Sequence, residues 1–113
     1  MTEHAEQVAL TKWLDGKGIP YFSVPNAGKR SYRTANYFRA EGMKRGAPDI
    51  VILRPVEDGA GGYATLFIEM KSKDGRLSPE QRDMHDVIRA EGNMVLVCRG
   101  CEDAVRQLVG LGL

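Results

Sequence analysis

The sequence predicts an α/β fold in which a mixed four-stranded sheet is flanked by helices. Segments with apolar residues at helical spacing alternate with short runs typical of strands, in the order α-β-α-β-β-α-β-α. A helix separates the last two strands, which predicts a right-handed crossover between parallel strands. With 113 residues, no internal repeat and no linker, the chain is expected to form one domain over residues 1–113.

The first half of the chain is expected to supply two helices and one strand. Residues 3–17 carry apolar side chains at helical spacing, and a glycine follows them. Residues 19–24 are predicted as a short strand and residues 34–41 as a short helix. A connector containing Gly46 and Pro48 leads out of this helix, since both residue types interrupt regular structure.

The second half is expected to supply three strands and two helices, at residues 50–54, 63–72, 78–91, 94–99 and 102–109. The first two of these segments are apolar strands joined by a glycine-rich turn. The helix that follows has a strong start, because Ser78 is an N-cap, Pro79 suits the first helical position and Gln81 completes a capping box.

Composition is that of a soluble globular protein, with 42% hydrophobic and 27% charged residues. No apolar run approaches the roughly 20 residues of a membrane span, so no membrane partner is expected. The polar and acidic residues 1–6 are unlike a signal peptide. We therefore expect the protein in a reducing cytoplasm.

Charge is segregated along a chain whose net charge is only +1. The stretch from residue 29 to residue 45 holds six basic residues and one acid, so it carries about +5 and the rest of the chain about −4. Such segregation is typical of a face that binds a polyanion, although a solvated basic loop explains it equally well. The basic residues of the stretch are Lys29, Arg30, Arg33, Arg39, Lys44 and Arg45.

Two acids and a lysine mark the central strands of the expected sheet. If the hairpin is centred near Gly59, the numbers of antiparallel partners add up to about 118, which sets Asp49 opposite Glu69. Lys71 lies two residues beyond Glu69 and therefore on the same face, while Met70 faces the core. The alternative is an ordinary cross-strand salt bridge on a solvated face.

These residue types suit the hydrolysis of phosphodiester bonds. Carboxylates bind hard cations such as Mg²⁺ or Mn²⁺ through oxygen. The bound metal lowers the pKa of a water molecule and polarises the phosphoryl oxygen. A nearby lysine orients the nucleophile or stabilises the developing charge. The sequence therefore predicts a metal-dependent DNA endonuclease with Asp49, Glu69 and Lys71 as catalytic residues.

Over nearly its whole length the sequence resembles the VRR-NUC domains of the PD-(D/E)xK nuclease superfamily. The matching positions are Asn26, Gly28, Gly42 and the segments 46–49, 69–71 and 75–81. The resemblance implies a restriction-endonuclease-like core and DNA cleavage with Mg²⁺ or Mn²⁺. The chain has the length of the stand-alone members found in phages and bacteria, which implies the cytoplasm of a bacterial or phage-infected host cell.

The resemblance also implies further roles around the metal. The carbonyl of Met70 would be an additional metal ligand, and Gln81 would lie beside the active site, although the capping box alone accounts for Gln81. An acid of the first helix would approach the metal directly or through water. We prefer Glu3 to Glu6 because Glu3 shares a helical face with Leu10. The ordinary explanation of either acid is a favourable interaction with the helix dipole.

Basic residues beside the site are expected to hold DNA phosphates on either side of the cut. No element resembles a base-reading motif, so recognition of branched or duplex DNA without sequence specificity is expected. The resemblance implies a homodimer that acts on branched DNA such as four-way (Holliday) junctions, where two active sites make two cuts. The predicted DNA-binding residues are Asn26, Lys29, Arg30, Arg33, Lys44, Arg45 and Lys73.

Two other functions fit parts of the sequence. Cys98 and Cys101 form the Cys-x-x-Cys of a redox protein, but only twelve residues follow them, and the adjacent Glu102 would raise the pKa of the thiols. A zinc site lacks a second cysteine pair. A non-catalytic DNA-binding module on the nuclease fold is the other alternative, although such a module has no need of a metal-binding cluster. His85, within the capped helix, is interpreted as a surface or packing residue.

Overall fold

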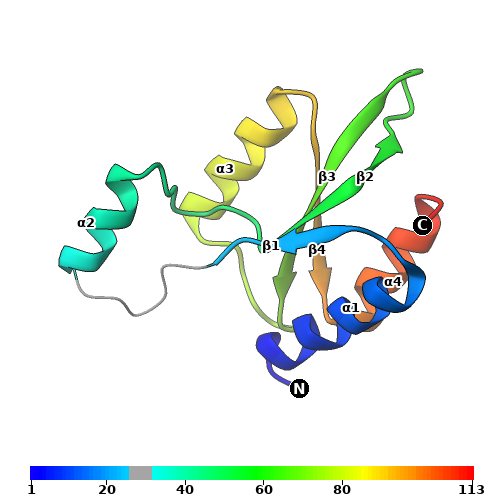
Figure 1. Ribbon diagram of the computed structural model, residues 1–113, viewed down its shortest axis with the longest axis horizontal. Helices are drawn as coiled ribbons and strands as arrows, with labels where there is room; N and C mark the ends of the chain where they lie inside the picture. The colour runs from blue at the N-terminus through cyan, green and yellow to red at the C-terminus, as the bar shows by residue number, and fades with distance from the viewer. Residues whose placement is uncertain (26–31) are drawn as a thin grey trace.

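Residues 1–25 and 32–113 are described by the computed structural model, and their helices and strands follow the predicted order (Figure 1). The helices are α1 (Glu3–Lys17), α2 (Tyr32–Ala40), α3 (Pro79–Ala90) and α4 (Cys101–Gly110). The strands are β1 (Tyr21–Ser23), β2 (Ile50–Glu57), β3 (Tyr63–Lys71) and β4 (Met94–Arg99). Most boundaries agree with the prediction to within about two residues, which is the usual uncertainty of helix ends.

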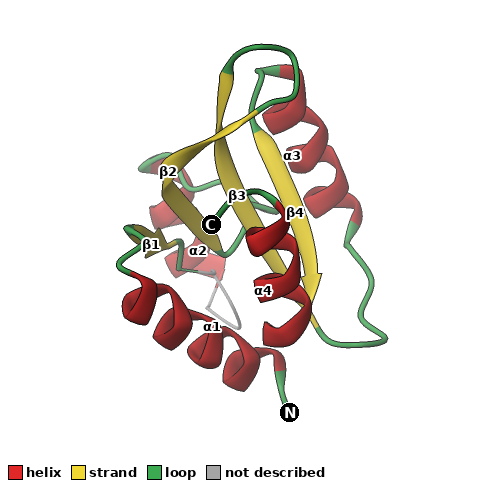
Figure 2. Cartoon of the chain, turned by 90° about the vertical axis from the view of Figure 1, so that its right-hand side faces the viewer, coloured by secondary structure: helices red, strands yellow, loops and turns green. Residues whose placement is uncertain are grey.

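The strands of the described residues form one mixed sheet in the order β1-β2-β3-β4. β1 and β2 are antiparallel, as are β2 and β3, whereas β3 and β4 run parallel and are joined through α3. Helices α1 and α4 lie against one face of the sheet, and α3 lies on the other face (Figure 2). This arrangement confirms the predicted class, a restriction-endonuclease-like mixed sheet flanked by helices.

Strand β1 is shorter than the predicted strand 19–24. Ile19 donates its N–H to the carbonyl of Leu14 at 3.0 Å, so this residue closes the end of α1 and does not join the sheet. Pro20 has no N–H to offer a neighbouring strand. Residues 18–20 therefore separate α1 from β1, and the first hydrogen bond to β2 is the one that the carbonyl of Pro20 accepts from Leu53 at 2.8 Å.

Strand β2 is longer than the predicted strand 50–54 and contains a proline, Pro55. The pairing of β2 with β3 shifts register between Ile52 and Val56, which is where Pro55 lies. A bulge of this kind accommodates a residue that cannot donate a ladder hydrogen bond. The sequence-based prediction ended the strand too early because it did not allow for the bulge.

Pairing on the site side of the bulge has the predicted register. Ile50 lies opposite Ile68, and Val51 lies opposite Phe67. On the turn side Glu57 lies opposite Tyr63, so the bulge restores the predicted register on the site side. The turn is closed by Asp58, whose Oδ1 accepts from the N–H groups of Ala60 at 2.7 Å and Gly62 at 3.0 Å. The prediction that Asp49 and Glu69 meet at the end of the hairpin rests on this register.

The hydrophobic core fills the space between the sheet and the helices α1 and α4. Its fully buried side chains include Leu10, Leu14, Ile50, Ile52, Leu66, Ile68, Met70, Ala104 and Leu108. Met70 is 1% exposed, which confirms that it faces the core. Because successive side chains of a strand alternate between faces, Glu69 and Lys71 point to the other face, toward α3.

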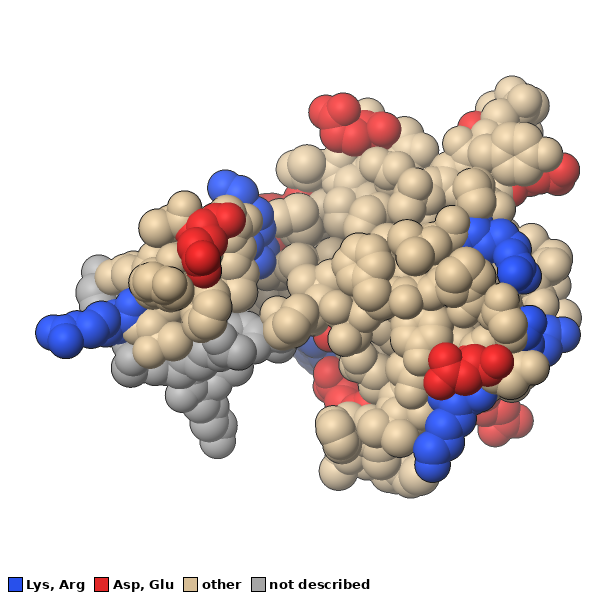
Figure 3. Space-filling view, in the orientation of Figure 1, with Lys and Arg blue, Asp and Glu red and all other residues tan. Residues whose placement is uncertain are grey.

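Helix α2 stands apart from the sheet, beyond β1 (Figure 1). Residues 41–49 connect it back to the start of β2. We refer to residues 32–45 as the α2 lobe. The space-filling view shows Lys and Arg side chains projecting from this lobe (Figure 3), which places part of the basic stretch on a protrusion beside the sheet.

Candidate active site

Asp49 lies at the end of the connector, immediately before β2. Its main-chain N–H donates to the carbonyl of Ile68 at 2.9 Å, and its Oδ2 accepts from the N–H of Met70 at 2.7 Å. The side chain thus continues the β2–β3 pairing where main-chain pairing ends. This double attachment fixes the Asp49 carboxylate beside the last residues of β3.

Glu69 is a buried acid, with 2% of its surface exposed. Its Oε1 lies 3.0 Å from Nε2 of His85, and its Oε2 accepts from Nε2 of Gln81 at 3.4 Å. Both partners come from α3, where they are four residues apart and so share one face of the helix. Helix α3 therefore presents two polar side chains to a carboxylate that has almost no access to water.

The surroundings of Glu69 favour its protonated form. Burial is the largest cause that raises the pKa of Glu69 to about 9, followed by a side-chain contact and charge repulsion with the neighbouring Asp49 carboxylate. Lys71 lowers the pKa in part, while Glu3 adds to the rise. Two carboxylates held together in this way keep a proton unless a cation neutralises them.

The residues present suit Mg²⁺ or Mn²⁺ as that cation. Asp49 and Glu69 offer hard oxygen donors at one place, and the raised pKa of Glu69 is the response expected of a carboxylate pair without its metal. No group of three His, Cys, Asp or Glu side chains with metal-binding geometry occurs within the described residues. Mg²⁺ is commonly held by one or two carboxylates and completed by water and substrate phosphates, so Asp49 and Glu69 are a sufficient set of carboxylates for this ion.

The two acids proposed for the first helix, Glu3 and Glu6, have different surroundings in the structure. Oε2 of Glu6 accepts from the main-chain N–H of Cys101 at 2.7 Å, at the start of α4. Helix α4 has no side-chain cap of its own because its N-cap residue is Gly100. Glu6 is thus engaged in capping α4, whereas Glu3 is exposed and lies near enough to raise the pKa of Glu69.

Gln81 both completes the capping box of α3 and contacts Glu69. Its Oε1 accepts from the N–H of Ser78 at 2.9 Å, and the hydroxyl of Ser78 accepts from the N–H of Gln81 at 3.1 Å. The remaining amide nitrogen points to Glu69. The capping box therefore aims one end of the Gln81 side chain at the carboxylate.

Of the two interpretations of His85, a surface residue or a packing residue, the first is wrong because the side chain is buried. His85 is 1% exposed and contacts Glu69, and burial lowers the pKa of its imidazole, with the nearby charge of Arg89 adding to the effect. The sequence did contain a sign that His85 points toward the site. His85 follows Gln81 by four residues, and that spacing places both side chains on one face of the helix.

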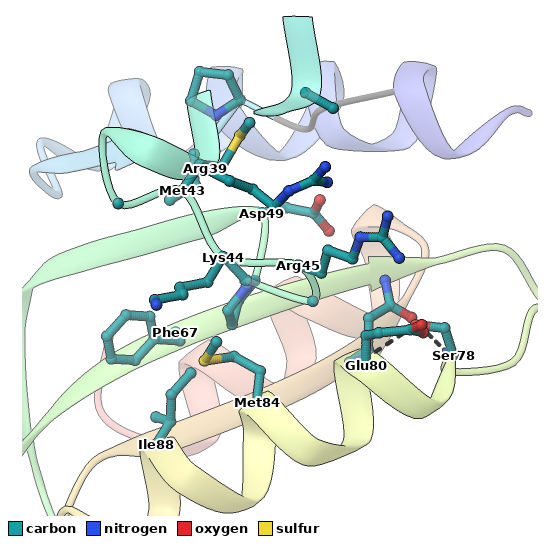
Figure 4. Close-up of a pocket in the computed structure, with 18 residues that line it drawn as sticks. Arg39, Met43, Lys44, Arg45, Asp49, Phe67, Ser78, Glu80, Met84 and Ile88 are labelled. Atoms are coloured by element: carbon teal, nitrogen blue, oxygen red, sulfur yellow. Dashed lines mark hydrogen bonds between the residues drawn. The ribbon is translucent and has the colours of Figure 1, made fainter. Parts of the chain in front are cut away.

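A cavity of about 900 Å³ opens beside Asp49, between the connector and α3 (Figure 4). Its rim carries basic side chains, and Figure 4 shows Arg39, Arg45 and Asp49 reaching the same end of the cavity. Its apolar wall includes Phe67 and Met84. The cavity thus combines cationic groups with apolar surface next to the carboxylate pair.

The closeness of the connector to α3 requires a glycine at residue 46. Gly46 has φ +81°, and a Cβ atom built there would lie 2.2 Å from the main-chain oxygen of Glu80. The connector therefore touches the backbone of the first turn of α3. This contact explains in physical terms why a glycine precedes Pro48 and Asp49 in the motif.

The model of the VRR-NUC domain family matches residues 1–102. The chain belongs to the VRR-NUC domain family. A solved structure described as a VRR_NUC domain protein shares the fold, with a TM-score of 0.79 and 24% sequence identity over 98% of this chain and 88% of that chain. No curated protein matches the sequence. VRR-NUC domains are a nuclease-type family that acts on DNA, and the paired carboxylates lie on that fold.

The residues predicted to bind DNA divide into three groups in this VRR-NUC fold. Lys44 and Arg45 line the cavity beside Asp49, as does Arg39, which was not among the predicted DNA-binding residues. Arg33 and Lys73 are exposed but lie outside the cavity lining. The last group, Asn26, Lys29 and Arg30, lies outside the described residues.

The two cysteines lie in surroundings that disfavour the thiolate form. Both are free, and Cys98 is fully buried in the core. Burial raises the pKa of Cys98 to about 12 and also raises the pKa of Cys101, so neither thiol ionises at neutral pH. None of the described helices is long and apolar enough to cross a membrane.

Proposed function

We propose that this VRR-NUC chain is a Mg²⁺- or Mn²⁺-dependent endonuclease that hydrolyses phosphodiester bonds in DNA. The observation that carries the proposal is the pairing of Asp49 with the buried Glu69, whose raised pKa marks a place that needs a cation. A structural salt bridge explains the arrangement poorly, because burial and the Asp49 carboxylate raise the pKa of Glu69 more than the charge of Lys71 lowers it. The metal, when bound, activates water and polarises the phosphoryl oxygen.

Each residue has a distinct part in the proposed reaction. Asp49 and Glu69 hold the ion, and the carbonyl of Met70 is available as a further oxygen donor. Lys71 lies two residues after Glu69 on the same face of β3, where its ammonium group lowers the pKa of Glu69. In the reaction this charge would orient the attacking water or stabilise the developing negative charge. Gln81 would keep Glu69 oriented, and Glu3 would approach the ion through water.

The expected substrate is DNA bound through its phosphates. Lys44 and Arg45 border the carboxylates on the side of the cavity, and Lys73 follows Lys71 on the side of the β3–α3 connection. Contacts of this type bind the DNA backbone and carry no sequence information. We therefore propose selection of DNA shape, with four-way junctions as the preferred substrate and Asn26, Lys29, Arg30 and Arg33 as additional contacts.

The test incubates the purified protein with a labelled four-way junction, a flap and a plain duplex, with EDTA, Mg²⁺ or Mn²⁺. Asp49→Asn should remove cutting of every substrate, while Asp83→Asn, an exposed acid of α3, serves as the matched control. Lys71→Ala should abolish cutting and leave junction binding largely intact. Tight, metal-independent binding without any cutting by the wild-type protein would instead support the non-catalytic DNA-binding module.

We further propose that the protein acts as a homodimer, as a junction with two symmetric cuts requires. Exposed apolar side chains on the edge strand β1 and on its neighbour β2 support this proposal. Phe22 of β1 is 50% exposed, and Leu53 of β2 is 53% exposed. Light scattering should give twice the mass of the chain, and Phe22→Glu with Leu53→Glu should give the mass of one chain. A monomeric wild-type protein would contradict the proposal.

A further inference from the structure

We propose that His85 is a positioning residue, whose Nε2–H holds Glu69 in the orientation in which this carboxylate binds the divalent cation. The inference rests on the proposed metal-dependent function and adds a residue that the nuclease motif does not include. The contact between His85 and Glu69 carries it.

The contact joins two side chains that are both shielded from water. Oε1 of Glu69 lies 3.0 Å from Nε2 of His85, and the two side chains are 2% and 1% exposed. Gln81, the other partner of Glu69, lies at 3.4 Å, which is long for a hydrogen bond. His85 therefore makes the shorter of the two contacts, and no water can take its place.

The other nitrogen of the ring shows why a histidine is present. An ionised Glu69 can only accept, so Nε2 must carry the proton of the neutral ring, which leaves Nδ1 as an acceptor. Nδ1 is buried and has no hydrogen-bond partner among the described residues. An apolar side chain would avoid the cost of this unpaired atom. The contact with Glu69 is therefore the role that accounts for a polar ring at this position.

The contact with His85 limits how freely the Glu69 carboxylate can rotate. With Oε1 held by His85, the plane of the Glu69 carboxylate is set by α3, and the charge faces Asp49 across the end of β3. Groups that orient a metal-binding side chain in this way commonly change metal affinity or activity by about 10- to 100-fold when they are removed. His85 should have an effect of that size without touching DNA or metal.

A pair of isosteric variants separates positioning from packing. In His85→Gln the side-chain amide nitrogen lies the same number of bonds from Cβ as Nε2, so it can still donate to Glu69. In His85→Asn the amide nitrogen corresponds to Nδ1, so the contact is lost. The readout is the affinity of the free protein for Mn²⁺ by calorimetry, with junction binding in EDTA as the control.

We expect His85→Asn to weaken Mn²⁺ binding by about 10-fold or more, and His85→Gln to stay within about 3-fold of wild type. Junction binding in EDTA should be equal in all three proteins. Equal Mn²⁺ affinities of the Asn variant and the wild type would overturn the role of His85 and leave the proposed function intact. A wild-type protein that binds no Mn²⁺ would overturn both.

A second measurement does not depend on the variants folding. In wild-type protein with ¹⁵N-labelled histidine, the nitrogen shifts of His85 should report a neutral ring protonated on Nε2 when Mg²⁺ is present. A ring protonated only on Nδ1 cannot donate to Glu69. That result would overturn the proposal even if cutting depends on Mg²⁺ as expected.

Discussion

Burial and the neighbouring Asp49 carboxylate raise the pKa of Glu69 to about 9, from an ordinary value of 4.5 that the group regains in the unfolded chain. As the pH rises, the unfolded chain loses this proton near pH 4.5, whereas the folded protein keeps it until about pH 9. The stability that the protonated group contributes is therefore complete below pH 4.5 and is lost progressively toward pH 9. At neutral pH the metal-free site opposes folding.

Glu69→Gln removes this pH-dependent cost and keeps an oxygen that can accept from His85. In EDTA at pH 8 the variant should have a Tm above that of wild type by about 5 °C, which corresponds to about 1 kcal/mol in a chain of this size. The two Tm values should converge near pH 5, and Mg²⁺ should raise only the wild-type value. Glu57→Gln, at an exposed acid, is the control. Parallel Tm curves from pH 5 to pH 9 would contradict the prediction.

Gly46 and Gly42 form a second matched pair. Both have positive φ, +81° and +104°, but a Cβ atom at Gly46 meets the backbone of Glu80, whereas nothing lies within 4 Å of one at Gly42. Gly42→Ala should therefore cost only the backbone strain of about 1 kcal/mol. Gly46→Ala should cost about 3 kcal/mol, because the connector must also move away from α3. Urea unfolding measures both, and equal losses would show that the connector does not touch α3.

For single residues, the sequence predicts a contact whose two partners are close in the chain and misses a contact whose partners are far apart. Ser78 and Gln81 form their capping box within one helical turn, and the prediction of it is confirmed. His85 contacts a residue 16 positions away on another element. Its helical face could be inferred, but no local pattern states which strand that face meets.

At the scale of elements, α1 and α4 are joined by one charged contact. Glu6 of α1 accepts from the first N–H group of α4, and the positive end of the α4 dipole favours the carboxylate. Glu6→Gln should lower the free energy of unfolding by about 1 kcal/mol, as the loss of a cap does. Glu3→Gln should leave stability unchanged and slow DNA cutting. Denaturant unfolding and cutting assays on both variants test this, and slower cutting by Glu6→Gln alone would reverse the assignment.

The chain after β3 is held by a contact that the sequence does not reveal. Arg99, at the end of β4, donates to the carbonyls of Ser72, Lys73 and Gly75. These residues follow Lys71 directly, so β4 fixes the path of the chain leaving the proposed catalytic lysine. The parallel pairing of β3 with β4 brings the groups together, and this pairing depends on the whole crossover through α3.

At the scale of the whole molecule, the register of one hairpin was enough to bring the proposed catalytic pair together from sequence. The bulge between Ile52 and Val56 sets that register, because it shifts the pairing between the turn and the site, and Pro55 marks its place in the sequence. The position of the α2 lobe could not be predicted in the same way. The position of the lobe depends on the contact of the connector with α3, which neither hydrophobic periodicity nor charge reveals.

The basic residues of the α2 lobe that line the cavity lead to a prediction about the binding of DNA. Lys44 and Arg45 line the cavity beside Asp49, while Lys12 and Arg106 are exposed on α1 and α4, which lie on the opposite face of the sheet (Figure 2). Each phosphate contact contributes about 0.9 to the slope of log K against log salt concentration. Lys44→Ala with Arg45→Ala should therefore flatten the slope for a junction in EDTA by about 2.

Lys12→Ala with Arg106→Ala removes the same charge from the molecule as a whole. If DNA binds through the cavity rim, this control should weaken binding slightly and leave the slope unchanged, because distant charges are screened beyond about 10 Å at 0.1 M salt. Equal changes of slope in the two double variants would mean that net charge alone attracts DNA. An effect confined to Lys44 and Arg45 would place the phosphates of the scissile strand beside Asp49, where the proposed reaction requires them.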